Sequence, residues 1–212
     1  MTETRTLRTD TTGRYLVERG PADAPFLVGF HGYGQNAEVL LEALRRIPGA
    51  EGWTLVSVQA LHPFYNRSQS VVASWMTSQD REAAIADNLA YVTRVIAALR
   101  AEGRSGKLVL AGFSQGAAMA WRTAAALPCD GLLTLGGDLP KDVAEAVTAL
   151  PPILMGRGEG DPLYSAEQFA KDLATLEQRG LHPEVCRFEG GHEWGDAFIE
   201  AAGRFLERIR LG

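Results

Sequence analysis

The chain alternates short apolar runs with longer segments of helical periodicity, and this alternation restricts its possible folds more than any other feature. Each run is rich in leucine or β-branched residues and almost continuously apolar, which is typical of strands covered on both faces. Such strands, separated by helices, predict an α/β fold with a mostly parallel central sheet. The expected strands are residues 26–30, 54–58, 107–113, 131–135, 152–156 and 184–188, and the expected helices are residues 37–46, 80–102, 115–126, 165–179 and 194–208.

The size of the chain fits one domain that spans residues 1–212. With 46% apolar residues, this length can bury a sizeable core, whereas two domains would be cramped. The segment 14–20, RYLVERG, is expected to add an antiparallel edge strand. About 16 residues separate the strand ending near Leu135 from the one starting near Pro152, which leaves no room for a cap domain.

Charge and hydropathy exclude several classes of partner. The net charge of −5 comes from acids and bases mixed along the chain, so nucleic acid is not an expected partner. No stretch approaches the roughly 18 apolar residues of a spanning helix, and the N-terminus is polar, so we expect a cytoplasmic protein without stable membrane insertion. Cys129 and Cys186 form neither a disulfide framework nor a metal pattern and are interpreted as reduced packing residues.

The pentapeptide GFSQG places Ser114 between Gly112 and Gly116, after an expected strand and before an expected helix. Gly-x-Ser-x-Gly in this setting is typical of a nucleophile elbow, where a tight turn holds the serine out for chemistry. The flanking glycines relieve crowding because they lack Cβ. A glycine-tolerant turn with an idle serine is the alternative interpretation.

A serine hydroxyl needs a base, and four histidines compete for that role. His192 follows the last expected strand, after the flexible pair at 190–191, and so lies on the carboxyl edge of the sheet, where open α/β sheets bind ligands. His182 precedes the same strand and falls on the opposite edge. His31, in a glycine loop, and His62, at the start of an aromatic loop, are expected to be structural or solvated. His192 is therefore the predicted base.

Three acids lie on the same edge and could orient that histidine. Asp161 follows the strand at 152–156 and gives the chain order serine, acid, histidine of α/β-hydrolases, so we place it first. Asp138, after the preceding strand, is the second candidate. Glu159 is the third, though a solvated loop carboxylate is its expected state. Asp130 precedes a strand and is excluded.

Acyl transfer also needs two donors for the developing oxyanion. The backbone amide of Gln115, directly after the serine, is one candidate, and the amide of Tyr33 in the loop HGYGQN is the other. Gln35 and Asn36 are expected to hold that loop in shape or to cap the following helix. The irregular segment 59–79 is expected to wall an apolar groove for an acyl chain or aromatic group, unless its side chains simply pack onto the core. The candidate groove residues are Phe64, Tyr65, Val71, Val72, Trp75 and Met76.

The motifs HGYGQN, GFSQG, GDPLYS and GGHEW, in this order, resemble the phospholipase/carboxylesterase branch of the α/β-hydrolases, which includes acyl-protein thioesterases. The resemblance extends from about Pro25 to about Leu206. It implies that Ser114 is the nucleophile, Asp161 the acid and His192 the base. Three departures are visible. Ala117 stands where relatives often have glycine, and the loop at 156–165 that carries Asp161, called the acid loop below, is longer and more polar. The loop bearing Ser74, Trp75 and Met76 resembles the tryptophan loop of the family but lacks the acidic residue that often follows it.

The expected activity is hydrolysis of a small-molecule or lipid-like acyl ester, thioester or lysophospholipid through an acyl-enzyme, without metal or organic cofactor. A peptidase and a dienelactone-hydrolase-like enzyme on the same fold are alternatives. The first usually adds a propeller or cap, and the second normally has cysteine at position 114. A catalytically inactive binding module is the alternative from another class. The oligomeric state stays open, with a homodimer as one option.

Overall fold

A seven-stranded sheet forms the centre of the protein, in the order β1-β3-β2-β6-β7-β8-β9. The computed structural model describes residues 1–102, 106–146 and 149–212. Only the edge strand β1 runs antiparallel to its neighbour β3, and the remaining pairs are parallel. The strands are β1 (Tyr15–Glu18), β2 (Phe26–Phe30), β3 (Thr54–Val58), β6 (Leu108–Phe113), β7 (Gly131–Leu135), β8 (Ile153–Gly158) and β9 (Glu184–Phe188).

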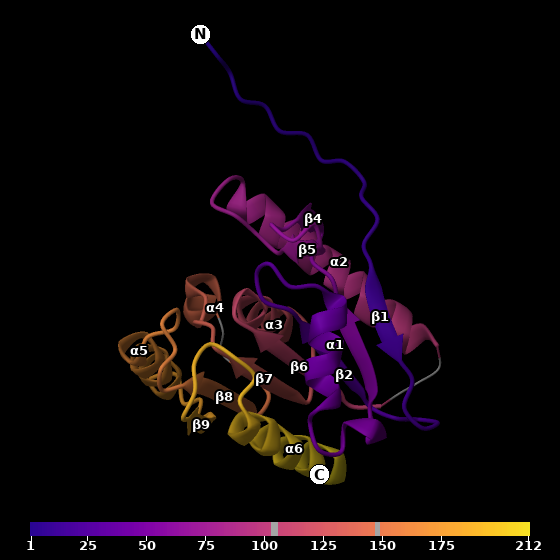
Figure 1. Ribbon diagram of the computed structural model, residues 1–212, viewed down its shortest axis with the longest axis vertical. Coiled ribbons are helices and arrows are strands. Elements are labelled where there is room, and N and C mark those ends of the chain that lie inside the picture. The colour runs from indigo at the N-terminus through magenta and orange to yellow at the C-terminus, as the bar shows by residue number, and fades with distance from the viewer. Residues whose placement is uncertain (103–105, 147–148) are drawn as a thin grey trace.

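Helices cover both faces of this sheet (Figure 1). Because side chains alternate along a strand, β2 sends Val28 and Phe30 into the core under α2 and α3, and Leu27 into the core under α1 and α6. The helices are α1 (Ala37–Arg45), α2 (Arg81–Ala101), α3 (Gln115–Ala126), α4 (Lys141–Ala146), α5 (Ala166–Glu177) and α6 (Asp196–Leu211), with a 3₁₀ turn at Ala50–Gly52. Within the described ranges, no helix is both long and apolar enough to cross a bilayer.

The expected alternation of strands and helices is confirmed. Every expected strand and helix is present, with ends that differ by three residues or fewer, and the segment 14–20 contains the antiparallel edge strand β1. The short helix α4 was not expected from the sequence. Among the described residues between β7 and β8, α4 is the one helix or strand, so they form no cap domain in this connection.

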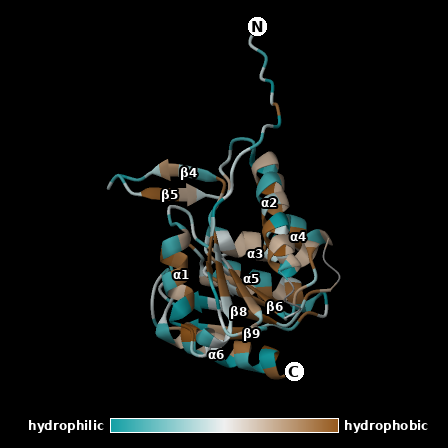
Figure 2. Ribbon diagram, turned by 90° about the vertical axis from the view of Figure 1, so that its right-hand side faces the viewer, coloured by the Kyte–Doolittle hydropathy of each residue, from teal (hydrophilic) through white to brown (hydrophobic). Residues whose placement is uncertain are grey.

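The segment 59–79, expected to be irregular, contains a β-hairpin instead. Its strands are β4 (His62–Tyr65) and β5 (Val71–Ser74), paired antiparallel. The side chain of Asn66 accepts hydrogen bonds from the amides of Ser68 and Ser70, which closes the turn between the strands. Figure 2 shows the hairpin projecting from the body of the protein.

Candidate active site

Ser114 lies at the sharp turn between β6 and α3, with φ 54° and ψ −122°, a strained conformation for a residue with a side chain. The neighbouring glycines make this turn possible. A Cβ on Gly112 would lie 2.4 Å from the carbonyl oxygen of Gly116, and a Cβ on Gly116 would lie 2.0 Å from that of Phe30. The turn therefore packs against β2 as well as against itself, and any side chain at either glycine would displace it.

The structure brings Ser114, His192 and Asp161 together into one hydrogen-bonded chain. The Nε2 atom of His192 lies 2.8 Å from Oγ of Ser114, and its Nδ1 atom lies 2.8 Å from Oδ2 of Asp161. If Nδ1 carries the proton, it donates to the carboxylate, and Nε2 is free to accept from the hydroxyl. The imidazole is thereby held in the tautomer and orientation that a general base requires.

The carboxylate of Asp161 is held in its charged form by several donors. Its second oxygen, Oδ1, accepts hydrogen bonds from the amides of Leu163 and Tyr164, at 2.8 and 3.0 Å. Burial opposes ionisation, but the hydrogen bonds from Tyr164, His192 and Leu163 outweigh it and lower the pKa of this carboxyl.

The other two candidate acids lie elsewhere. Asp138 is exposed and lines a cavity beside Ser114, and Glu159 is an exposed residue of the acid loop. Among the described residues, it is the carboxylate of Asp161 that is hydrogen-bonded to His192.

The remaining histidines are far from this arrangement or occupied within the core. His31 is fully buried, with Nδ1 donating to the carbonyl of Gly32 and Nε2 accepting from the amide of Ala60. Burial lowers its pKa, and this neutral histidine braces the loop after β2. His62 and His182 are both exposed, on the hairpin and before β9 respectively.

Three amides of the loop after β2 donate to acceptors within the protein. The amide of Gly32 donates to the side chain of Gln35, that of Gln35 to the carbonyl of Gly32, and that of Gly34 to Ala73. Within the described part of the chain, the amides of Tyr33 and Gln115 donate to no protein acceptor. They are therefore free to donate to an atom bound at the serine.

The side chains of Gln35 and Asn36 hold this loop in the way the sequence suggests. Gln35 accepts from Gly32 at 2.9 Å, and Asn36 caps α1 by accepting from the amide of Val39 at 3.0 Å.

The apolar groove expected from the segment 59–79 is not lined by Trp75 or Met76. The side chains of both are buried, and the indole of Trp75 donates to the carbonyl of His31 at 2.8 Å, with its ring against those of Phe30 and His31. At both positions the side chain packs onto the core, which was the alternative interpretation of this segment.

The hairpin residues are more accessible than the loop that follows them. The ring of Phe64 is half-buried and lies 5.6 Å from that of Tyr33, while Tyr65 is 69% exposed. Val71 is 45% exposed, whereas Val72 is buried. Phe64 is therefore the hairpin side chain that reaches the loop after β2.

Two further side chains support the site and were not singled out from the sequence. The side chain of Gln115 accepts from the amide of Trp75 and donates to the carbonyl of Met76, both at 2.8 Å, which ties the end of the hairpin to the elbow. The buried guanidinium of Arg157 donates to the carbonyls of Tyr164 and Glu159, one on each side of Asp161. The sequence does contain a sign of the structural role of Arg157, because an arginine is unusual inside an apolar run such as ILMGRG.

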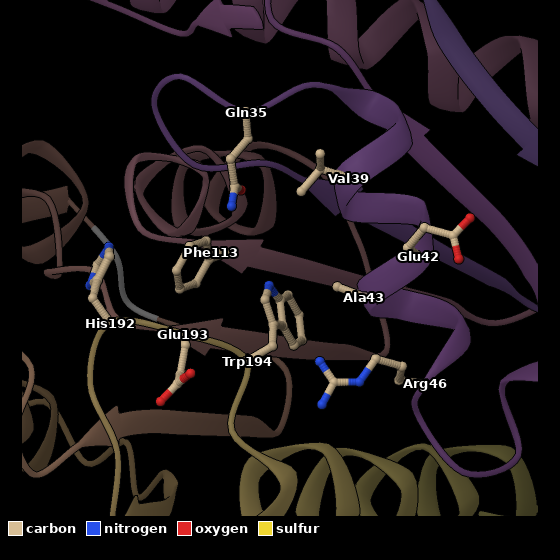
Figure 3. A pocket seen from close by; sticks show the side chains of 9 residues that line it. All are labelled: Gln35, Val39, Glu42, Ala43, Arg46, Phe113, His192, Glu193 and Trp194. Carbon is tan, nitrogen blue, oxygen red and sulfur yellow. The ribbon is translucent and has the colours of Figure 1, made fainter. Parts of the chain in front are cut away.

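Two cavities open on either side of His192. One, of about 310 Å³, lies between α1 and the loop before α6, and Figure 3 shows Phe113, Trp194 and Arg46 around it. The other, of about 290 Å³, is lined by Ser114 and Gln115 together with Asp138 and side chains of the acid loop. Only the second of these two cavities is lined by the serine.

The strand order and the position of Ser114 after the central strand β6 place the protein among the α/β-hydrolases. The family model described as phospholipase/carboxylesterase matches residues 15–209. The chain belongs to this family, as its motifs suggest. No curated protein sequence matches the chain significantly.

Solved structures with the same fold include several esterases. The crystal structure of esterase PE8 is 24% identical, with a TM-score of 0.73, and the match covers 93% of this chain and 98% of that chain. The Zea mays acyl-protein thioesterase 2 is 20% identical, with a TM-score of 0.76 and coverage of 95% and 100%. The Bacillus cereus carboxylesterase is 15% identical, with a TM-score of 0.75 and coverage of 94% and 96%. At these identities the similarity shows the fold.

Proposed function

We propose that the protein is a serine hydrolase that cleaves carboxylic esters or thioesters through an acyl-enzyme on Ser114. The observation that carries this proposal is the hydrogen-bonded chain from Asp161 through His192 to Ser114, with 2.8 Å at each step. Membership of the phospholipase/carboxylesterase family supports the same reaction class.

In the first half of the reaction, Oγ of Ser114 attacks the substrate carbonyl carbon while Nε2 of His192 takes the hydroxyl proton. The carbonyl oxygen becomes negatively charged and accepts hydrogen bonds from the amides of Tyr33 and Gln115. The imidazolium is stabilised by the ionised carboxylate of Asp161, whose low pKa keeps it charged near neutral pH. When the tetrahedral species collapses, the leaving oxygen or sulfur takes the proton from His192.

In the second half, a water molecule attacks the acyl carbon and gives its proton to the same nitrogen of His192. The second tetrahedral species collapses to release the carboxylic acid, and the proton returns to Oγ of Ser114. All transferred protons pass through one imidazole, so no metal or cofactor enters this scheme.

The two cavities suggest where the parts of the substrate lie. The acyl group stays attached to Ser114 between the two halves, so it belongs in the cavity lined by Ser114 and Gln115. The leaving group must be close to His192, which protonates it, and the cavity of about 310 Å³ borders this histidine. Its walls include the charged side chains of Glu42, Arg46 and Glu193 as well as Phe113 and Trp194. The two aromatic rings suit an aromatic or alkyl leaving group of a small-molecule or lipid-like ester.

The nucleophile is tested by labelling with a fluorophosphonate probe and by hydrolysis of p-nitrophenyl acetate. We expect the wild type to be labelled and active, and Ser114→Ala to lose both properties. Ser68→Ala, at an exposed serine in the turn of the hairpin, is the matched control and should keep both. Labelling that survives in Ser114→Ala would assign the nucleophile to another residue, and a folded but inactive wild type would favour the binding-module alternative.

A further inference from the structure

Asp138 occupies a position beside the serine that the proposed reaction does not use. It lies three residues after the end of β7, its side chain is exposed, and it lines the cavity of about 290 Å³ that Ser114 and His192 also line. Within the described part of the chain, its carboxylate has no hydrogen-bond or ion-pair partner in the protein. Asp138 therefore brings a negative charge to the wall of the acyl cavity, available to a bound group.

The second polar side chain of this cavity, Gln168 of α5, offers an acceptor as well. Its Nε2 atom donates to Oδ1 of the buried Asp172 at 2.7 Å, which leaves its Oε1 atom for other partners. The hydroxyl of Tyr164, on the same wall, also donates to Asp172, at 2.7 Å. Both of these donors are therefore engaged with Asp172, and the carboxylate of Asp138 and Oε1 of Gln168 are acceptors open to the cavity.

Positively charged side chains lie farther along the same side of the molecule. A larger cleft, of about 850 Å³, shares Asp138 and Gln168 with the acyl cavity, and its walls include Arg81, Lys141 and Lys171. None of these three lines the cavity at Ser114. The outer cleft also contains Glu82 and Asp142, so it carries charges of both signs, whereas the described residues that line the cavity beside the serine include no lysine or arginine.

We propose that the cavity beside Ser114 selects acyl groups that carry a positive charge a few bonds from the carbonyl, with Asp138 as the specificity-determining residue. The carboxylate attracts the cation, Gln168 presents its oxygen, and the hydrocarbon of Leu163 and Tyr164 contacts the chain between charge and carbonyl. An unbranched fatty acyl chain offers this exposed carboxylate no partner and gains nothing from its charge. This inference rests on the proposed acyl-enzyme at Ser114.

The test compares two p-nitrophenyl esters that differ in a single atom. The 4-(trimethylammonio)butanoate carries a quaternary nitrogen where the 5,5-dimethylhexanoate carries a carbon, so shape is constant and charge changes. Rates are divided by the spontaneous hydrolysis rate of each ester. We expect the wild type to prefer the cationic ester in kcat/KM by about fivefold, as for a partly solvated ion pair. Added salt should reduce this preference because the charges are accessible to solvent.

The variant Asp138→Asn keeps the size of the side chain and removes its charge. We expect the preference for the cationic ester to fall to about one, because the neutral amide distinguishes the two esters by neither shape nor charge. Glu159→Gln removes another exposed carboxylate from the same edge without touching the cavity, and should leave the preference unchanged. Equal preference in the wild type and Asp138→Asn would overturn the proposal.

A binding measurement separates this proposal from the proposed reaction. The N-methylamides of the same two acids are titrated into the wild type and Asp138→Asn by calorimetry, which needs no turnover. Tighter binding of the cationic amide that disappears in Asp138→Asn supports the assignment of the cavity even if no ester is hydrolysed. Equal binding of the two amides by the wild type overturns it, even if Ser114 proves to be the nucleophile.

Discussion

Gly116 and Phe30 are in such close contact that a single methyl group between them cannot be accommodated. A Cβ at position 116 would lie 2.0 Å from the carbonyl oxygen of Phe30, an atom fixed by the sheet. The start of α3 is therefore pressed against the end of β2, and the serine before it is held above the carboxyl edge of the sheet. The glycine is required by the packing of helix on strand as much as by the turn.

The variant Gly116→Ala should be destabilised by more than about 2 kcal/mol, because either the helix or the strand must move to relieve the overlap. Urea unfolding followed by circular dichroism measures this change. Gly191→Ala is the matched control, since a Cβ there has no atom within 4 Å and the residue has no positive φ. The control should change stability by less than about 1 kcal/mol, and equal stability of the two variants would contradict the packing argument.

The roles of the two carboxylates of the acid loop can be separated by matched amide substitutions. Asp161→Asn keeps the shape of the side chain but presents a neutral group to His192, which removes stabilisation of the imidazolium and permits the wrong tautomer. We expect kcat for p-nitrophenyl acetate to fall by about 10³-fold or more with an intact fold. Glu159→Gln, two residues away and exposed, should stay within about twofold. Comparable losses in both variants would remove Asp161 from the mechanism.

The fold and the residues beside the serine could be predicted from the sequence because the relevant signals are local or follow from sheet geometry. GFSQG is a local pattern, and a parallel sheet brings the residues after β8 and β9, including Asp161 and His192, to the edge where Ser114 lies. Trp75 gave no such signal. Its burial depends on contacts with Phe30 and His31, which are more than forty residues earlier in the chain.

The sequence did not predict the hairpin or the support that Arg157 gives to the acid loop, and the reasons are related. The turn at Asn66 closes through side-chain hydrogen bonds to Ser68 and Ser70, and a polar stretch of this kind reads equally well as a loop. Arg157 donates to backbone carbonyls, which every residue has, so the amino-acid types at the accepting positions do not indicate these hydrogen bonds.

The buried imidazole of His31 makes stability depend on pH. Burial lowers its pKa, so the folded protein keeps this histidine neutral at pH values where the unfolded chain already binds a proton. Stability should therefore be fully present above the ordinary histidine pKa of about 6.5 and should fall as the pH drops through that value. Melting temperatures between pH 8 and pH 5 measure this dependence.

The variant His31→Gln supplies an acceptor for Ala60 and a donor for Gly32 without a titrating group. Its melting temperature should be lower at pH 8 but should change less between pH 8 and pH 5 than that of the wild type. The exposed His182 offers the control, since His182→Gln should leave the pH dependence as it is. A pH dependence unaltered in His31→Gln would mean that other groups govern acid unfolding.

Arg157 is expected to act on the reaction through Asp161 without touching the substrate. Its Nε atom donates to the carbonyl of Tyr164 at 2.6 Å and its terminal nitrogen to that of Glu159 at 3.2 Å, so one buried side chain spans the loop that carries the acid. Lysine in its place keeps the charge but cannot donate along the two fixed directions of a guanidinium. We expect Arg157→Lys to lower kcat by about tenfold, with KM changed less than twofold, because the loop no longer holds Asp161 against His192.

A role limited to stability predicts a different result for the same variant. Arg157→Lys would then melt at a lower temperature and yet, assayed well below that temperature, keep the wild-type kcat. Arg187→Lys, at an exposed arginine of the neighbouring strand β9, controls for the general effect of the exchange and should leave kcat unchanged. A drop in kcat that is confined to position 157 identifies Arg157 as a positioning residue of the acid loop.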